Sequence, residues 1–399
     1  MSTSKVQTLK GFRDFLPSEM AVRNAVKKIC IDTFELFGYQ PIETPTLEYS
    51  SVLTGKYGAE ADKLIYTFTD KGGREVGLKY DLTVPTARVL SSYNLPLPFK
   101  RYQIQPVFRA DNTQKGRYRE FLQCDIDCFG YKSPIVDAEI ITIIFKILEK
   151  LNFKKYSIRI NNRELLKNIP NTVLQSFDKL DKIGEDGVKN ELKDKGIAND
   201  EISKYFDYIK TVQPDDYLKQ VFDALDKFGV PKTAYVFDPT MIRGLDYYTG
   251  VIFETYVEEP KIGSITGGGR YDNLVKTLGG PDIPAIGTTI GLDRIVDCIL
   301  ELKLMPDIKS TKTKIMVANF GETDKELEIL NLLRNNNISS TYYFAPEKLG
   351  KQITYADSLG IEFIAIIGEN EAKDGTITLK NLKTKEQKTV DSKKLIKML

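Results

Sequence analysis

The chain contains 399 residues, of which 41% are hydrophobic and 28% are charged, a composition typical of soluble globular proteins with two or three domains. Lysine and arginine number 57 and aspartate and glutamate 55, so the net charge of +2 does not by itself indicate a nucleic-acid-binding protein. The sequence has no histidine, which excludes Ser-His-Asp and Cys-His nucleophile systems and every metal site with an imidazole ligand.

The N-terminal hundred residues predict a long helix, an extended segment and a small strand pair. Residues 1–10 are polar and do not form a signal peptide, and no apolar run of about 18 residues is available to span a membrane. We therefore expect a cytoplasmic protein without a membrane partner. The predicted elements are a helix over 18–37, an extended segment over 39–47, strands over 64–68 and 75–80 around a turn at 70–73, and a helix over 84–92.

A basic stretch follows between two strands. The strands are predicted over 104–108 and 121–129, so that 109–119 forms the loop of a hairpin. This loop carries four basic residues and one acidic residue, which fits either a solvated loop or a loop that faces phosphates. Those residues are Arg109, Lys115, Arg117, Arg119 and Asp111. A strongly apolar helix with proline at its first position is predicted over 134–151.

The composition changes at about residue 163. The stretch 163–232 is rich in lysine, aspartate and leucine with helical periodicity, and we interpret it as a helical insertion. Strand patterns then return, followed by three consecutive glycines that fit either a tight turn or close approach of a ligand. The predicted elements are strands over 234–238, 250–256 and 261–266, the glycine turn over 267–269, and a helix over 290–302.

A polar connector over 303–312 leads to a different pattern. Strands and helices alternate from 314 to the C-terminus, with a hairpin near the end, which predicts a separate α/β domain of about 90 residues. The four cysteines contain no C-x-x-C pair, and without histidine they cannot easily complete a zinc shell. We expect Cys30, Cys124, Cys128 and Cys298 to be buried free thiols.

The candidates for chemistry are arginines, tyrosines and carboxylates. Residues 243–250 place Arg243 next to Tyr247 and Tyr248 between glycines, which is not a core strand pattern. An arginine here could stabilise charge on a transferring phosphoryl group, and the phenols could bind a polar, planar ligand. Aspartates more often lie on the surface or have a structural role. Asp81 and Asp127 could nevertheless hold an ammonium or an imidazole N–H together with Gln123.

At these residues the chain resembles the histidyl-tRNA synthetases, which are class II aminoacyl-tRNA synthetases. Pro45 lies where the class II dimer-interface motif has its proline, and 107–130 (VFRADNTQKGRYREFLQCDIDCFG) resembles the second motif. Residues 287–295 (GTTIGLDRI) resemble the third motif, with its arginine at Arg294. RGLDYYTGVIFE from Arg243 and GGGRYDNLV from Gly267 are similar to the two signatures peculiar to this family.

This resemblance implies a fold, a set of domains and an oligomer. We expect an α+β class II catalytic domain with an antiparallel sheet over 1–305, including the helical insertion, in an obligate homodimer. A linker over 306–312 is expected to lead to an α/β anticodon-binding domain over 313–399. The implied activity is ATP-dependent ligation of L-histidine to histidine tRNA through a histidyl-adenylate.

The resemblance also implies roles for single residues. For histidine, they are Asp81, Thr83 and Gln123 at the α-amino group, Asp127 and Tyr248 beside the imidazole, and Tyr247 and Tyr271 along the pocket wall. For ATP, they are Arg109 at the α-phosphate, Arg294 at the γ-phosphate and adenine region, Arg243 at the α-phosphate and the histidine carboxylate, and Asp111 and Arg117 elsewhere on the nucleotide. Mg²⁺ would bridge the phosphates without a resident protein metal site. Gln114, Lys115 and Arg119 would meet the acceptor end of the tRNA.

Two alternatives share this fold without the ligase activity. One is the regulatory subunit of ATP phosphoribosyltransferase, whose members generally lack the C-terminal domain and lose motif arginines. The other is a tRNA-sensing module of the kind found beside a kinase, and no kinase segment is present. Arg109, Arg243 and Arg294 are all present in the sequence, which favours the active enzyme.

Overall fold

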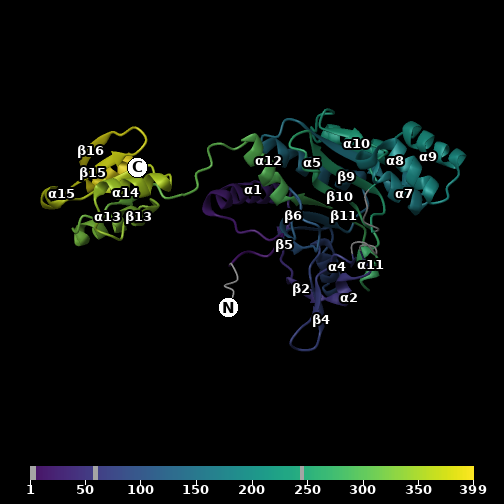
Figure 1. Ribbon diagram of the computed structural model, residues 1–399, viewed down its shortest axis with the longest axis horizontal. Coiled ribbons are helices and arrows are strands. Elements are labelled where there is room, and N and C mark those ends of the chain that lie inside the picture. The colour runs from purple at the N-terminus through teal and green to yellow at the C-terminus, as the bar shows by residue number, and fades with distance from the viewer. Residues whose placement is uncertain (1–5, 57–61, 243–246) are drawn as a thin grey trace. The chain divides into compact units, whose positions relative to one another are not determined.

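The computed structural model describes residues 6–56, 62–242 and 247–399. The chain divides into two compact units. The first contains Ala25–Pro306 with the N-terminal residues up to Asp14, and the second contains Asp307–Leu399 with Phe15–Asn24. Figure 1 shows that each unit is built around its own β-sheet.

An eight-stranded sheet forms the centre of the first unit, with the strand order β1-β5-β6-β11-β10-β9-β7-β8. The six strands from β5 to β7 pair antiparallel, and the edge strands β1 and β8 pair parallel with their neighbours. The expectation of an antiparallel class II sheet is therefore confirmed. The strands are β1 (Gln40–Pro41), β5 (Phe99–Phe108), β6 (Glu120–Phe129), β7 (Tyr156–Asn162), β8 (Tyr235–Phe237), β9 (Val251–Val257), β10 (Ser264–Arg270) and β11 (Ala285–Gly291).

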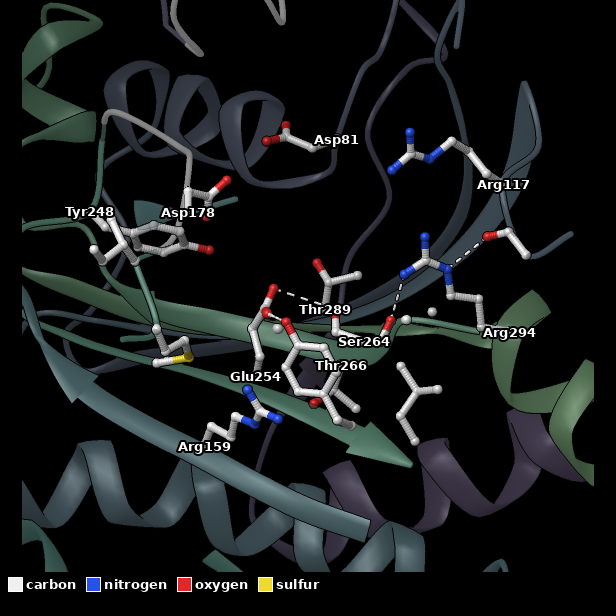
Figure 2. A pocket seen from close by; sticks show the side chains of 18 of the residues that line it. Asp81, Arg117, Arg159, Asp178, Tyr248, Glu254, Ser264, Thr266, Thr289 and Arg294 are labelled. Carbon is white, nitrogen blue, oxygen red and sulfur yellow. Dashed lines mark hydrogen bonds between the residues drawn. The ribbon is translucent and has the colours of Figure 1, made fainter. Parts of the chain in front are cut away.

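The helices of this unit leave one face of the sheet available for a site. α5 packs against β6, β10 and β11, and α12 packs against β6 and β10. Figure 2 shows helices beneath the sheet and the labelled cavity side chains Asp81 and Arg117 above it. α5 is largely buried, and Ser133 caps its N-terminus by accepting a hydrogen bond from the Ile135 amide. The helices are α2 (Ser50–Leu53), α4 (Thr83–Ser92), α5 (Pro134–Lys150), α11 (Leu274–Thr277) and α12 (Leu292–Leu302), together with α1 (Pro17–Leu36) from Ala25 onward.

The hairpin β5–β6 carries the basic loop that the sequence predicts. Its register runs from Phe99 opposite Phe129 to Phe108 opposite Glu120, so 109–119 is the connecting loop as expected. A second, three-stranded sheet has the order β2-β4-β3. β3 and β4 fall close to the predicted strand pair, and β2 begins where the predicted extended segment ends. Those strands are β2 (Leu47–Tyr49), β3 (Thr67–Thr69) and β4 (Glu75–Leu78).

The three glycines at 267–269 do not form the turn that the sequence suggests. They lie in the middle of β10, between β9 and β11. A Cβ atom at Gly268 would stand 2.2 Å from the carbonyl oxygen of Gly287, and one at Gly269 would stand 2.7 Å from that of Val251. Glycine is therefore required here because neighbouring backbone approaches closely, and the turn prediction is wrong.

Two further strands escape the sequence analysis. One is β7, which follows α5, and the other is β11, which precedes α12. The sequence predicts that the helix begins at residue 290, but that residue still belongs to β11. The insertion between β7 and β8 contains five helices and no strand in its described residues, and buries its own apolar cluster. These helices are α6 (Arg163–Leu166), α7 (Asn171–Phe177), α8 (Leu180–Asp194), α9 (Asn199–Thr211) and α10 (Asp216–Lys227).

The second unit has a five-stranded sheet in the order β13-β12-β14-β15-β16. β12 pairs parallel with β13 and β14, and the last two strands form an antiparallel hairpin, in agreement with the predicted alternation. Apolar clusters cover both faces of this sheet. Its elements are β12 (Ile315–Val317), α13 (Thr323–Asn335), β13 (Ser340–Tyr342), α14 (Leu349–Ser358), β14 (Phe363–Ile366), α15 (Glu369–Asp374), β15 (Thr376–Asn381), β16 (Gln387–Asp391) and α16 (Ser392–Met398).

Candidate active site

A cavity of about 1480 Å³ opens above the antiparallel sheet of the first unit. Its walls come from β6, β9, β10 and β11, from the start of α4, from the β5–β6 loop and from α7 and α8 of the insertion. Figure 2 shows Asp81 and Arg117 across the cavity from Glu254, Ser264 and Thr289. The cavity therefore collects side chains from segments that are far apart in the sequence.

One end of the cavity presents carboxylate, hydroxyl and amide groups at the N-terminus of α4. Asp81 and Thr83 are nearly buried, and Asp81 Oδ1 accepts a hydrogen bond of 3.0 Å from the Val84 amide, which fixes the carboxylate at the helix start. Gln123 on β6 is also buried, and its Nε2 donates to Thr289 Oγ1 at 3.3 Å. The structure thus brings the three predicted amino-group ligands into one cavity.

Asp127 lies deeper in the same cavity and is held from two sides. Arg101 Nη2 lies 2.5 Å from Asp127 Oδ2, and the Tyr271 hydroxyl donates to Oδ1. The Tyr271 ring packs edge-on against Tyr247, and Tyr247 contacts Tyr248 with ring centroids 4.9 Å apart. The predicted imidazole pocket is therefore a carboxylate surrounded by phenol rings.

Burial controls the protonation of these groups. It raises the pKa of Asp127, while Arg101 and the Tyr271 hydroxyl act in the opposite direction. Asp125, two residues earlier on β6, has a pKa raised well above its ordinary range, mainly by burial. Burial also raises the pKa of Tyr271 well above 10, so its hydroxyl stays a hydrogen-bond donor at neutral pH.

Arg109 stands at the opening of the β5–β6 loop between two aromatic rings. Its guanidinium carbon is 4.2 Å from the ring centroid of Tyr80 and 5.1 Å from that of Phe121, and its Nε donates to the Tyr80 carbonyl oxygen at 3.1 Å. These contacts orient the guanidinium while keeping it in the cavity wall. Arginine in such a position can bind a phosphate oxygen with its remaining N–H groups.

Arg294 at the start of α12 connects the loop to the sheet. Its Nε donates to the Gly116 carbonyl oxygen at 2.7 Å and its Nη1 to that of Ser264 at 2.6 Å, as Figure 2 shows. Arg117 lines the cavity from the same loop, in a tight turn in which the backbone groups of Gln114 and Arg117 bond each other. Asp111 also lines the cavity, so all the described nucleotide-binding candidates lie around one space.

The three residues expected to meet tRNA do not lie together. Gln114 and Lys115 line the cavity, and Lys115 pairs with Glu301 at 2.6 Å on the surface. Arg119 instead reaches toward the N-terminal segment, where it donates to the carbonyl oxygens of Lys10 and Asp111. Arg243 lies outside the described residues.

Sequence reasoning misses Arg101 and Thr289, although a usable signal was present. β5 carries Arg101 and Gln103 at a spacing of two, and β6 carries Asp125 and Asp127 at the same spacing, directly opposite. Polar residues at every second position of paired central strands indicate a buried polar row rather than a solvated face. All four side chains are buried.

The residues present fit ATP, and they fit Mg²⁺ as an ion carried by the nucleotide. Arg109, Arg117 and Arg294 supply the positive charge that polyphosphate binding requires. No group of three or more Cys, Asp or Glu side chains able to hold a metal ion occurs among the described residues. Mg²⁺ usually takes one or two carboxylates and completes its shell with phosphate oxygens and water, so a larger protein cluster is not required.

Two further observations concern the cysteines and the apolar character of the helices. All four cysteines, which lie in the described part of the chain, are buried free thiols, as predicted. Within the same ranges, no helix combines the length and the apolar character needed to cross a membrane.

Comparison with known proteins gives matches over nearly the whole chain. Residues 11–195 and 191–295 match the family described as Histidyl-tRNA synthetase, and residues 314–399 match the Anticodon binding domain family. The chain is 37% identical to a Histidine--tRNA ligase of Clostridium tetani, over 99% of this chain and 98% of that one. It is 39% identical to a Histidine--tRNA ligase of Phocaeicola vulgatus, over 97% of each chain. The crystal structure of histidyl-tRNA synthetase from Nostoc sp. PCC 7120 covers 100% of both chains, with a TM-score of 0.84 and 31% identity.

Proposed function

Because the chain belongs to the histidyl-tRNA synthetase family, we propose that the cavity above its antiparallel sheet binds ATP and L-histidine and forms histidyl-adenylate. The chain then transfers the histidyl group to histidine tRNA. The observation that carries this function is the meeting, in one cavity, of a buried carboxylate pocket with several arginines. The pocket suits an amino acid with an imidazole ring, and the arginines suit the phosphates that must react with it.

The carboxylate end of the cavity is the proposed histidine pocket. Asp81, Thr83 and Gln123 bind the α-amino group, and the nearly complete burial of the three strengthens their interaction with a cation. Asp127 accepts a hydrogen bond from the imidazole, and Tyr248 lies on the other side of the ring. Tyr247 and Tyr271 form the walls, and an amino acid without a ring N–H could not donate a hydrogen bond to the Asp127 carboxylate.

The arginine end is the proposed ATP site. Arg109 binds the α-phosphate, and its stacking between Tyr80 and Phe121 supports this role. Arg294 binds the γ-phosphate and adenine region, with Arg117 and Asp111 along the nucleotide. Arg243 contacts the α-phosphate and the histidine carboxylate. Mg²⁺ neutralises phosphate charge when it is bound with the nucleotide.

This set of residues suits the reaction even though the chain has no histidine. The carboxylate of the substrate is already ionised at neutral pH, so its attack on the α-phosphate needs no general base. The reaction requires orientation of the two substrates and neutralisation of charge, which arginines supply. In the transfer step, the proton of the tRNA hydroxyl leaves through the substrate phosphate.

We further propose how the rest of the molecule serves this site. Gln114, Lys115 and Arg119 meet the acceptor end of the tRNA, and residues 313–399 form an anticodon-binding domain after a linker at 306–312. Residues 1–305 form the catalytic domain, with 163–232 as an insertion. The enzyme is a cytoplasmic homodimer.

A non-catalytic role is less well supported. The regulatory subunit of ATP phosphoribosyltransferase and a tRNA-sensing module would need neither the phosphate-binding arginines nor the complete chain. Arg109 and Arg294 both line the cavity, and the full-length relatives described above are named as ligases.

Histidine-dependent exchange of pyrophosphate into ATP tests the proposed chemistry. We expect the wild-type chain to catalyse this exchange, and Asp127→Ala to raise the KM for histidine by roughly tenfold or more because a charge-assisted hydrogen bond is lost. The same variant should discriminate less well against other amino acids. An unchanged KM for histidine would show that Asp127 does not bind the imidazole.

A further inference from the structure

Arg101 is a fully buried charge that lies behind Asp127, which lines the proposed histidine pocket. It lies on β5, directly opposite Asp127 in the register of the β5–β6 hairpin, and its side chain has no exposed surface. A guanidinium keeps its charge in proteins, and a buried charge requires a counter-charge. Asp127, with its Oδ2 at 2.5 Å, is placed to supply that counter-charge. Burial raises the pKa of Asp127, and the nearby guanidinium opposes that increase and so favours the ionised carboxylate.

Arg101 also connects the two ends of the pocket. Its Nη2 donates to the Leu82 carbonyl oxygen at 3.4 Å, and Leu82 lies between Asp81 and Thr83. The same nitrogen pairs with Asp127, so one guanidinium holds the segment proposed for the α-amino group and the carboxylate proposed for the imidazole. Its Nη1 donates to Gln103 Oε1 at 3.4 Å, which fixes the plane of the group.

Resting on the proposed function, we infer that Arg101 is a positioning residue that makes the pocket accept the neutral imidazole of histidine and reject the imidazolium. The guanidinium balances the charge of Asp127, and the carboxylate then acts as a hydrogen-bond acceptor for a ring N–H. A second proton on the ring would bring another cation close to Arg101, without a free negative charge to offset it.

The other titratable groups around Asp127 do not change the charge balance between Arg101 and Asp127. Burial raises the pKa of Asp125 well above its ordinary range, which favours its neutral form. The pKa of Tyr39 and that of Tyr271 are raised well above 10, and the pKa of Cys128 is raised to about 11, so all three stay protonated near neutral pH. Asp81 lies at the start of α4, where it is assigned to the α-amino group of the substrate.

The test measures the KM for histidine and for ATP in pyrophosphate exchange between pH 5.5 and 7.5. For the wild type, the KM for histidine should rise roughly tenfold as the pH falls across this range, because the neutral fraction of a side chain with a pKa near 6.5 falls by about that factor. The KM for ATP should change by less than about twofold. A KM for histidine that stays constant would overturn the inference without a variant being made.

Arg101→Gln should reverse this pH dependence. Without the guanidinium, binding of histidine next to Asp127 takes up a proton, so the KM for histidine should be raised at pH 7.5 and should fall toward pH 5.5. Arg101→Lys keeps the charge and should restore the wild-type direction. A Gln variant with the wild-type pH dependence, or one in which the KM for ATP rises by the same factor, would contradict the role.

Arg270→Gln is the matched control. It removes an arginine that is as deeply buried as Arg101. Its partner, the buried Asp137 on α5, does not line the cavity, whereas Asp127, the partner of Arg101, does. This variant should lose stability while its KM for histidine keeps the wild-type pH dependence. If it behaves as Arg101→Gln does, the effect is general destabilisation and the inference fails.

The same experiment separates this inference from the proposed function. Absence of histidine-dependent exchange in the folded wild type would contradict the function itself. Exchange with a pH-independent KM for histidine would contradict the role of Arg101 alone. If Arg101→Gln does not fold, the wild-type profile and Arg101→Lys still decide the outcome.

Discussion

The charged side chains of the cavity are held in place by groups that are not themselves reactive. Arg109 lies against two aromatic rings, Arg294 against two backbone carbonyl oxygens, and Asp127 between a guanidinium and a phenol. Each contact fixes a charge before the substrate arrives, which reduces the reorganisation needed during the reaction. The proposed chemistry depends on this placement of charge rather than on proton transfer.

Replacing Arg109 should therefore affect the chemical step more than binding of histidine. We expect Arg109→Ala to lower kcat for pyrophosphate exchange by roughly 100-fold, as for loss of one preorganised donor at a developing charge. The KM for histidine should change little. Arg74→Ala is the control, because Arg74 is exposed and pairs with Asp70 in a surface turn. Exchange by Arg109→Ala at the wild-type rate would remove this residue from the proposed mechanism.

Lys79 gives a prediction about stability. Its side chain is fully buried, and its Nζ donates to Gln105 Oε1 at 2.7 Å and to the Thr44 carbonyl oxygen at 3.3 Å. Burial lowers the pKa of Lys79 from 10.5 to about 8, against the opposing effect of Glu43, Glu48 and Asp125. Between these two pH values the unfolded chain binds more protons than the folded one, so stability contributed by this group rises with pH.

The comparison with Lys79→Met isolates this effect. Between pH 7.5 and 9.5 the free energy of unfolding of the wild type should increase by roughly 2 kcal/mol relative to that of the variant. Urea titrations of both proteins at the two pH values provide the measurement. An equal change in both proteins would mean that Lys79 does not have a lowered pKa in the folded state.

The sequence motifs identify the pocket residues that the structure describes, but they do not identify the residues that hold those side chains in place. Asp81, Gln123, Asp127 and Tyr271 follow from the family resemblance, and the structure brings all of them to one cavity. Thr289 contributes through the pairing of β11 with β6, and pairing between segments so far apart in sequence has no local signature. Arg101 becomes predictable once the register of β5 and β6 is known.

At the scale of elements, the hairpin β5–β6 and the glycine-rich strand β10 position the site. The hairpin carries Gln123, Asp125 and Asp127 on β6, and its loop carries Arg109 and Arg117. β10 runs through the middle of the sheet, and neighbouring backbone approaches it closely at Gly268 and Gly269, which have no side chains. The glycines therefore contribute to the site by allowing close packing of the strands under the cavity.

A single methyl group in β10 should therefore disturb the sheet. Gly268→Ala would place a Cβ atom 2.2 Å from the Gly287 carbonyl oxygen, and we expect the free energy of unfolding to fall by roughly 2 kcal/mol or more. Gly291→Ala in β11 is the control, because its Cβ would make an ordinary contact of 3.4 Å with the Ile265 carbonyl oxygen. The control should lose less than about 1 kcal/mol. Equal losses in a urea titration would refute the packing role.

Two of the strands that local patterns predict poorly, β10 and β11, share a cause. β10 (SITGGGR) and β11 (AIGTTIG) contain glycine and threonine where an ordinary core strand has large apolar residues, so their sequences favour turns. Long amphipathic helices such as α1 and α5 were predicted to within a residue or two, since their periodicity and caps are local. The antiparallel arrangement of the sheet followed from the resemblance and not from periodicity.

At the scale of the whole molecule, the chain combines two units. The first matches the Histidyl-tRNA synthetase family and the second matches the Anticodon binding domain family. The nearly balanced composition, with a net charge of +2, gives no sign of a cavity that is lined by both carboxylates and arginines. The absence of histidine excludes catalytic systems such as the Ser-His-Asp triad. It is compatible with this reaction because the nucleophile is the ionised carboxylate of the substrate. Similarity over the whole chain to histidine--tRNA ligases joins these features into one activity.

Transfer of labelled histidine to histidine tRNA by the purified chain tests this central claim most directly. The chain, with ATP and Mg²⁺, should attach histidine to that tRNA and should attach no other amino acid at a comparable rate. Omission of ATP should abolish the product. A folded chain that binds histidine or tRNA but forms no histidyl-tRNA under these conditions would contradict the assignment and favour a non-catalytic relative.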